Sequence, residues 1–325
     1  MSEFALIRQH FARLGSGRGD VLLGVGDDCA LLAPPAGQAL AVSTDTLIEG
    51  VHFPPATSPE AVGYKALAVN LSDLAAMAAE PAWFTLALTL PDADAGWLRR
   101  FTGGLSAAAA PWGVQLVGGD TTRGSLTIGI TVFGFVPAEQ ALRRGGAQPG
   151  DRLFVTGTLG DAAAGLALWQ GRLHGDGEAA ETLRERLQRP TPRLVEARAL
   201  RGLASAAIDL SDGLCGDLGH LLAASQVGAR IDQAALPLSP ALRSLAGPQA
   251  VEWALRGGDD YELLFTVPPA RVAALKARAG AWPSALSEIG EITARSGLAV
   301  VDEQGVARPL QTGYDHFATD SGGER

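Results

Sequence analysis

The chain has 325 residues, of which 47% are hydrophobic and 19% are charged, and its net charge is −9. This length suits two domains, and this composition argues against extended disorder and against a coiled coil. The negative charge argues against a nucleic-acid-binding surface. The two cysteines, Cys29 and Cys215, form no CxxC pair and predict neither a disulfide framework nor a zinc site.

The chain shows no sign of export or membrane insertion. Its first residues lack a basic segment followed by an apolar run, so we expect no secretory signal. Spanning a bilayer takes about 18 or more apolar residues in a row, and no stretch approaches that length. These observations predict a cytoplasmic protein without contact to a membrane.

Strand-like apolar runs alternate with helix-like stretches along the chain, which predicts an α/β or α+β fold. The strands are expected at 22–25, 39–43, 83–90, 114–117, 126–136, 152–156, 206–209 and 262–267. The helices are expected at 61–79, 95–110, 160–169, 192–203, 213–223 and 270–279. The range 137–150 is rich in Gly, Pro and Arg, so it predicts the boundary between an amino-terminal domain (1–137) and a carboxy-terminal domain (138–325).

Five short segments place aspartates beside glycine, serine or threonine next to an expected strand. They are GVGDD (24–28), STDT (43–46), GGDTT (118–122), DLSDG (209–213) and GGDD (257–260). The first four are expected as loops that follow a strand, and the fifth as a loop that precedes one. Ligands collect at the carboxyl ends of strands in open α/β sheets, so we expect several of these aspartates to converge.

Converging carboxylates repel one another and need a positive counter-charge. Mg²⁺ is the natural one, because it takes oxygen ligands and is held by one or two carboxylates plus substrate phosphates. The chain has only two lysines, Lys65 and Lys276, and no P-loop motif. Metal ions and arginine are therefore expected to neutralise phosphate charge, with Arg143 and Arg144 as the candidates.

Each of these motifs also has a structural interpretation. A single Asp before Gly is more often a turn or a helix cap than a ligand. Asp73 is different, because Asp is unfavourable within an apolar helix and should face a polar site or a partner. The segment 24–26 lacks the third glycine of a dinucleotide fingerprint, and Ser211 has no G-x-S-x-G setting.

Taken together and in order, the motifs resemble the thiamine-monophosphate kinase family. They cover about residues 3 to 318, as GVGDDCA (24–30), STDT (43–46), VHF (51–53), YKALAVNLSDLAAM (64–77), GGDTTRG (118–124), RRGGAQPGD (143–151), IDLSDGL (208–214), GGDDYELLFTV (257–267) and GYDHF (313–317). The resemblance implies the two-domain fold of the aminoimidazole-ribonucleotide synthetase superfamily, with an amino-terminal domain that forms a β-barrel across a homodimer. It also implies ATP-dependent phosphorylation of thiamine monophosphate to thiamine diphosphate by direct in-line transfer, the final step of thiamine diphosphate biosynthesis.

The resemblance further implies the roles of individual residues. The Mg²⁺ ligands would be Asp28, Ser43, Thr44, Asp45, Asp73, Asp120, Asp209 and Asp212, with Asp27 as the alternative to Asp28 in the first loop. ATP would contact Gly119, Asp120, Arg144 and Ser211, of which Asp120 and Arg144 would be catalytic. Thiamine monophosphate would contact His52, Asp259 and Tyr314. The family often has Glu at position 259, and Asp keeps the charge there, so we expect this contact to survive.

The chemistry of the implied phosphoryl transfer also fits the residue types of these motifs. The acceptor is a phosphate monoester, which is largely dianionic at neutral pH and needs no general base. It needs relief from repulsion against the triphosphate and in-line positioning. Carboxylates that hold several Mg²⁺ ions supply both.

Two other hypotheses stay open. The first is another ATP-dependent synthetase of the same superfamily, forming an amidine or a selenophosphate. A selenophosphate synthetase would carry a reactive amino-terminal Cys or selenocysteine beside Lys, and the hydrogenase-maturation enzyme would end in a reactive Cys. This chain has neither feature. Neither of its cysteines lies beside a lysine, and no Cys follows Cys215. The second is a nucleotide-binding regulator without turnover, which would leave the acceptor-side residues without a purpose.

Overall fold

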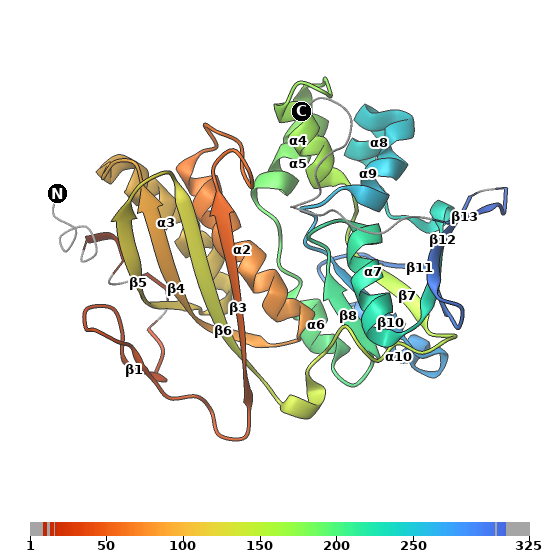
Figure 1. Cartoon of the computed structure of the whole chain (residues 1–325), viewed down its shortest axis with the longest axis horizontal. Helices are drawn as coiled ribbons and strands as arrows, with labels where there is room; N and C mark the ends of the chain where they lie inside the picture. Colours follow the sequence, from red (N-terminus) through yellow and green to blue (C-terminus); the bar gives the residue numbers. More distant parts are fainter. Residues whose placement is uncertain (1–8, 12–13, 16, 303, 310–325) are drawn as a thin grey trace.

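The computed structural model describes residues 9–11, 14–15, 17–302 and 304–309. Within these residues, two sheets and their helices pack side by side (Figure 1). A short hairpin of β1 (Val21–Leu23) and β2 (Leu31–Leu32) precedes the first sheet. In this part of the chain, no helix is long and apolar enough to cross a bilayer.

The amino-terminal sheet has the strand order β3-β6-β4-β5, so β3 and β5 form its two edges. The strands are β3 (Ala39–Ile48), β4 (Glu80–Leu90), β5 (Gln115–Arg123) and β6 (Thr127–Val136). β6 is antiparallel to β3 and β4, whereas β4 and β5 are parallel. The helices α2 (Pro59–Ala76) and α3 (Ala95–Ala109) cover one face of this sheet (Figure 1).

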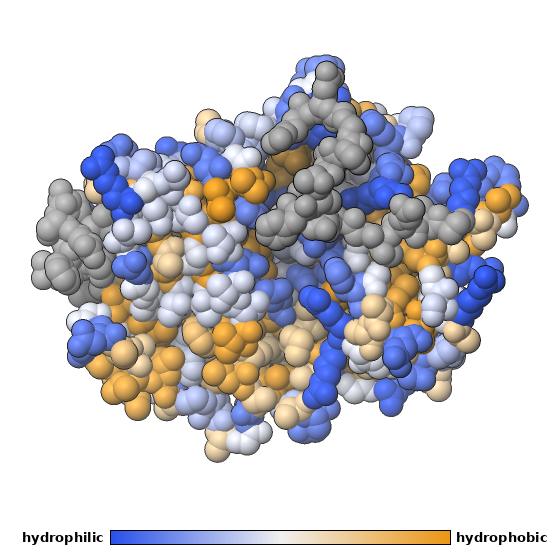
Figure 2. Space-filling view, in the orientation of Figure 1, coloured by the Kyte–Doolittle hydropathy of each residue, from blue (hydrophilic) through white to orange (hydrophobic). Residues whose placement is uncertain are grey.

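The opposite face of the amino-terminal sheet carries exposed side chains. Side chains alternate between the two faces of a strand, so Ser43 and Asp45 of β3 lie on the α2 side while Val42 and Thr44 lie on the outer side. Apolar surface is visible over this sheet in Figure 2. The large apolar side chains of β1, β2 and β3 that are between 37% and 70% exposed are Leu22, Leu23, Leu31, Leu40, Val42 and Ile48.

The carboxy-terminal sheet has the strand order β13-β12-β9-β11-β7-β10-β8. Its strands are β7 (Arg152–Thr156), β8 (Ala206–Asp209), β9 (Gly228–Asp232), β10 (Leu263–Val267), β11 (Leu286–Thr293), β12 (Gly297–Val301) and β13 (Ala307–Pro309). All neighbours are antiparallel except β9 and β12.

The helices of the carboxy-terminal half pack on both faces of its sheet and, for three of them, in a separate buried cluster with one another. They are α4 (Asp161–Trp169), α5 (Gly177–Gln188), α6 (Leu194–Leu200), α7 (Leu214–Ser225), α8 (Pro240–Ala246), α9 (Ala250–Arg256) and α10 (Val272–Ala279). The three in the separate cluster are α4, α5 and α8. α7 and α9 share a core with Val155 of β7, whereas α6 and α10 pack on the side of Phe154 and Phe265. The alternation of Phe154 and Val155 thus assigns one apolar residue to each face.

One hydrophobic core joins the two halves of the molecule. Leu67 and Leu71 of α2 belong to the same buried cluster as Phe154 and Phe265 of the carboxy-terminal sheet. Burial of apolar side chains therefore holds the halves together, with α2 between them (Figure 1). Polar residues on the side of α2 that faces the carboxy-terminal half lie close to residues from both halves.

The expected strands and helices are all present, and three strands extend further than predicted, one of them being β4, which begins at Glu80 and not at 83. β3 continues to Ile48 and β5 to Arg123, so the prediction that the segments 43–46 and 118–122 are loops was wrong. Thr is a favourable strand residue, and Thr44 Oγ1 lies 2.8 Å from Thr131 Oγ1 on the neighbouring strand. The segments 24–28, 209–213 and 257–260 contain the predicted loops.

Several elements were not predicted. They are the strands β2, β9, β11, β12 and β13 and the helices α5, α8 and α9. Most are short, and β9 contains Gly228 and an exposed Arg230 that interrupt its apolar pattern. The range 137–150 holds the 3-10 turn η2 (Ala138–Gln140) and connects β6 to β7.

Candidate active site

The helix α2 brings predicted site residues from both sheets together. Ser43 Oγ of β3 donates a hydrogen bond to Asp73 Oδ2 of α2. One residue earlier on the helix, Ser72 Oγ donates to Asp209 Oδ2 at the end of β8, at 2.7 Å. The backbone N–H of Asp45 donates to Asn70 Oδ1 at 3.1 Å. As expected for an aspartate within an apolar helix, Asp73 faces a polar site.

Three of these carboxylates repel one another. Burial raises the pKa of Asp45 to about 6, and the charge of Asp73 adds to the rise. Burial raises the pKa of Asp209 to about 7, and Asp73 and Asp45 contribute further. Burial also raises the pKa of Asp73, against the hydrogen bond from Ser43 and the charge of Arg144. The group carries more negative charge than its surroundings balance.

Asp217 joins this group and was missed by the sequence analysis. It lies in the first turn of α7 and is 3% exposed, and its Oδ2 accepts the backbone N–H of Asp212 at 3.0 Å. Burial raises its pKa to about 8, against that hydrogen bond, and Asp209 and Asp212 add to the rise. The signal in the sequence was an aspartate five residues after Asp212, at the start of the helix that follows the DLSDG loop.

Two cavities flank the carboxylates. A cavity of about 220 Å³ is lined by Ser43, Asp73, Arg144 and Asp209, together with apolar residues of β3, α2 and β8. A second cavity, of about 500 Å³, is lined by Asp45, His52, Lys65, Ser211, Asp212, Asp259 and Tyr261 among others. The first thus holds predicted metal and ATP residues, and the second holds predicted residues for metal, ATP and thiamine monophosphate.

A lysine and a tyrosine that the sequence analysis did not assign contact Asp259 in the larger cavity. Lys65 Nζ donates to Asp259 Oδ2 at 3.1 Å and to the carbonyl oxygen of His52 at 3.2 Å. Tyr261 OH donates to Asp259 Oδ1 at 3.1 Å. The ring of His52 is held too, because its Nδ1 accepts the backbone N–H of Ile48 at 3.0 Å. Tyr314, the other expected acceptor residue, lies outside the described residues.

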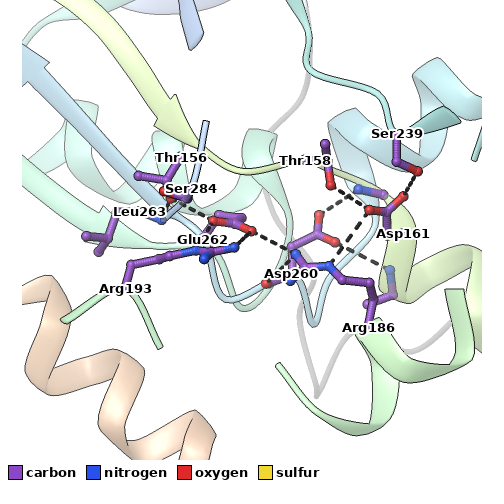
Figure 3. A network of polar contacts seen from close by, with 12 residues as sticks. Thr156, Thr158, Asp161, Arg186, Arg193, Ser239, Asp260, Glu262, Leu263 and Ser284 are labelled. Carbon is purple, nitrogen blue, oxygen red and sulfur yellow. Dashed lines mark hydrogen bonds and ion pairs between the residues drawn. The ribbon is translucent and has the colours of Figure 1, made fainter. Parts of the chain in front are cut away.

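A buried ionic network lies next to the Asp259 loop, at the start of β10 (Figure 3). Glu262 is 0% exposed, and its two carboxylate oxygens accept from Arg193 Nε and Nη2, both at 2.6 Å. Arg186 Nη2 donates to the same carboxylate at 2.8 Å, and Thr156 Oγ1 donates at 2.7 Å. Burial raises the pKa of Asp260, whose carboxylate accepts the backbone N–H of Gly160 at 2.7 Å.

Asp120 and Gly119 lie on the far edge of the amino-terminal sheet. Asp120 of β5 follows Ala87, Gly129 and Thr46 in one row across the four strands. Three strand spacings separate β5 from β3, so Asp120 lies about 14 Å from that strand. Gly119 has φ +152°, and a Cβ there would lie 1.9 Å from the carbonyl oxygen of Leu86, so this position requires glycine.

The remaining predicted ligands also lie away from the carboxylate group. Asp27 and Asp28 are exposed in the loop between β1 and β2. Val25 of the same loop lines a small cavity of about 40 Å³ together with Gly119 and Asp120. Thr44 is exposed on the outer face of β3. Within one chain, the predicted metal ligands therefore fall into one group at β3, α2 and β8 and another at β5 and the β1–β2 loop.

In the described part of the chain, no three His, Cys, Asp or Glu side chains form a ready-made metal cage. Mg²⁺ does not need one, because it keeps several waters and takes one or two carboxylates plus substrate phosphates. The candidate ligand atoms around the two cavities, which together are called the cleft below, are carboxylate and hydroxyl oxygens. These are the ligands that this ion prefers. The donor set therefore fits Mg²⁺.

Comparison with known proteins decides the family. Residues 26–136 match the model for the AIR synthase related protein N-terminal domain, and residues 148–303 match the corresponding C-terminal domain. The thiamine-monophosphate kinase of Escherichia coli (strain K12) is 53% identical over 320 residues, which are 98% of each chain. The chain belongs to the thiamine-monophosphate kinase family.

Solved structures of this family superpose on 90% or more of this chain. The crystal structure of thiamine-monophosphate kinase from Stenotrophomonas maltophilia K279a matches with a TM-score of 0.86 and 50% identity, over 95% of this chain and 98% of that one. The structure of AaThiL complexed with AMPPCP and TMP matches with a TM-score of 0.78 and 35% identity, over 90% and 92%. The two-domain α/β architecture implied by the motifs is thereby confirmed.

Proposed function

We propose that this protein transfers the γ-phosphoryl group of ATP to thiamine monophosphate, forming thiamine diphosphate and ADP. The observation that carries the proposal is the 53% identity to a thiamine-monophosphate kinase over 98% of both chains. A structural relative binds AMPPCP, an ATP analogue, and TMP. These relatives support a kinase rather than an enzyme that forms an amidine or a selenophosphate.

The smaller cavity is the proposed end of the ATP phosphate chain. Arg144 is its cation, and its carboxylates are Asp73 and Asp209. Ser211, which follows β8, lines the larger cavity and is proposed to contact ATP from that side. Arg144 would stabilise charge on the transferring phosphoryl group, because guanidinium groups bind phosphate oxygens in a bidentate manner.

The larger cavity is the proposed site of thiamine monophosphate. His52 and Asp259 line it, and Asp259 attracts the positive charge of the thiazolium ring. Tyr314 is the third proposed contact, by resemblance to the family. The acceptor is already largely dianionic at neutral pH, so these residues need to orient it and not to deprotonate it.

Mg²⁺ is the proposed counter-ion of the carboxylates. Ser43, Asp45, Asp73, Asp209 and Asp212 would hold it from one chain. Bound Mg²⁺ would neutralise the repulsion between the two phosphate groups that react. The raised pKa values of Asp45 and Asp209 support the proposal, because such repulsion is relieved when a cation binds.

A homodimer would complete the site. We propose that the open edges β3 and β5 of two copies pair to close a β-barrel, which buries apolar side chains such as Leu40 and Val42. This pairing places Asp120 of the partner subunit beside β3. It would bring Asp28, Gly119 and Asp120 next to Thr44 and the other predicted ligands on β3, whereas within one chain β5 lies about 14 Å from β3.

Subunit complementation tests the shared site. Asp45→Asn and Asp120→Asn dimers are each expected to be inactive. Refolded together, they form mixed dimers in which one site has both wild-type aspartates, so about one quarter of the wild-type activity returns. Activity that stays absent in verified mixed dimers would show that both aspartates act from the same chain.

Other features of the proposal concern organisation and location. We place the amino-terminal domain at 1–137 and the carboxy-terminal domain at 138–325, because the segment 137–150 separates the two sheets. We propose a cytoplasmic location, because ATP is the phosphoryl donor of the proposed reaction. The negative net charge supports small-molecule partners rather than nucleic acid.

ADP production tests the function directly. The protein is assayed with ATP and Mg²⁺, with thiamine monophosphate, thiamine or an aminoimidazole precursor as the acceptor. We expect ADP and thiamine diphosphate only with thiamine monophosphate. ADP formed equally without it would overturn the proposal.

A further inference from the structure

Lys65 is a buried cation between the two halves of the molecule. Its side chain is 4% exposed, whereas the other lysine, Lys276, is 59% exposed. Lysine is almost never buried unless it is paired. Its ammonium group reaches Asp259 Oδ2 of the carboxy-terminal half and the carbonyl oxygen of His52 in the amino-terminal half. Lys65 thus connects the two described residues that we propose to contact thiamine monophosphate.

The Asp259 loop is held in an unfavourable backbone conformation. Asp259 has φ +68° and Tyr261 has φ +50°, which is the left-handed region that non-glycine residues rarely adopt. Such conformations persist where the surroundings determine them. The backbone N–H groups of both residues are bound, Asp259 to Ser211 at 2.8 Å and Tyr261 to Leu210 at 2.8 Å. This places the carboxylate of Asp259 between Lys65 and the hydroxyl of Tyr261.

The position of Lys65 on α2 explains how it reaches across. Lys65 and Ser72 are seven residues apart, so they lie on the same side of the helix two turns from each other. Ser72 bonds to Asp209 and Lys65 bonds to Asp259, both in the carboxy-terminal half. One side of α2 therefore contacts both cavities. Ser72 binds Asp209, which lines the smaller cavity, and Lys65 binds Asp259, which lines the larger one.

We propose that Lys65 is a positioning residue for the phosphate acceptor, an inference that rests on the proposed function. Its 4% exposure leaves little of its surface for a ligand, whereas Asp259 is 31% exposed. Lys65 acts through Asp259 by fixing the direction of its carboxylate. An ionised carboxylate accepts about four hydrogen bonds, and Lys65 and Tyr261 use two, so acceptor capacity remains for thiamine monophosphate.

The test is a double-mutant cycle in the dimeric protein. Lys65→Met is expected to lower kcat/KM for thiamine monophosphate by about 10- to 100-fold, because misplacing a binding group costs about that much. The KM for ATP is expected to stay unchanged, since Lys65 is not among the residues that we propose to contact ATP. Lys65→Arg keeps the charge and is expected to fall between Met and wild type. Lys276→Met also removes a lysine at 3.1 Å from a carboxylate and is the control, with wild-type kinetics.

The second arm of the cycle separates positioning from simple stabilisation. If Lys65 acts through Asp259, then Lys65→Met adds little in an Asp259→Asn background. Independent, multiplying losses would overturn the inference, as would an equal rise in the KM for ATP. If Lys65→Met does not fold, Lys65→Arg carries the same comparison. A wild-type protein without thiamine-monophosphate-dependent ADP production would instead overturn the proposed function.

Discussion

Two groups of carboxylates that are buried or half-buried, one in the cleft and one beside the Asp259 loop, have opposite surroundings in this fold. Glu262 lies against two guanidinium groups and a hydroxyl at 2.6 to 2.8 Å. Asp45, Asp73 and Asp209 face one another, and no ion pair between described residues reaches any of them. Among the described residues, the side-chain hydrogen-bond donors to these three carboxylates are the hydroxyls of Ser43 and Ser72.

The difference supports the proposal that Glu262 is structural and that the carboxylates in the cleft bind a cation. A buried charge that is already paired with arginine contributes to a fixed shape. Buried carboxylates that repel one another destabilise the protein when no cation is bound, and a cation that binds them relieves the repulsion. Proteins keep such an arrangement where binding a cation is part of the function.

The largest expected effect comes from a substitution in the group that is paired with arginine. Glu262→Gln removes the ion-pair partner of Arg193 and leaves Arg186 with Asp161, at 3.8 Å, so the free energy of unfolding is expected to fall by about 3–5 kcal/mol. Urea denaturation followed by circular dichroism measures it. The residual folded protein should retain its KM for ATP. A change below about 1 kcal/mol would mean that the network does not hold the loop.

The same chemical change in the cleft should have the opposite result. Asp209→Asn keeps an oxygen for the hydroxyl of Ser72 and removes one repelling charge. We expect kcat to fall roughly 100- to 1,000-fold, as for the loss of one electrostatic contact to the transition state. The free energy of unfolding near pH 8 should be unchanged or higher. Full activity would remove Asp209 from the proposed metal ligands.

The smallest effect is the pH dependence of stability without metal. The pKa values of Asp45 and Asp209 are raised to about 6 and about 7, whereas unfolded Asp titrates near 3.9. The folded state therefore holds these protons to higher pH, and the free energy of unfolding falls as the pH rises from about 4 to about 7. Mg²⁺ should raise Tm more at pH 8 than at pH 5.

Thermal denaturation with EDTA or with Mg²⁺ at both pH values makes this measurement. Asp209→Asn serves as the matched variant, in which the difference between the two pH values should shrink. Equal stabilisation by Mg²⁺ at pH 5 and pH 8 would contradict the assignment of these carboxylates as its ligands.

Local sequence patterns predicted the long elements and the chemical character of the site. The apolar periodicity of 61–79 predicted the helix that carries Asp73, and the unfavourable position of an aspartate there indicated a polar neighbour. The loops at 209–213 and 257–260 followed from their Gly and Asp content. The short elements β9, α8 and α9 were missed because few residues carry their pattern, and two Thr-containing segments were placed in loops although they continue strands.

The sequence by itself determined the α/β class, the family and the types of residue that we propose to hold phosphate and Mg²⁺, because these depend on short motifs and local propensities. Tertiary structure decided which of them meet. It brought Ser72 to Asp209 and Lys65 to Asp259, and it separated Asp120 from Asp45 by the width of a sheet. Contacts between residues as distant as Lys65 and Asp259 depend on how α2 packs between two sheets, and no local pattern encodes that packing.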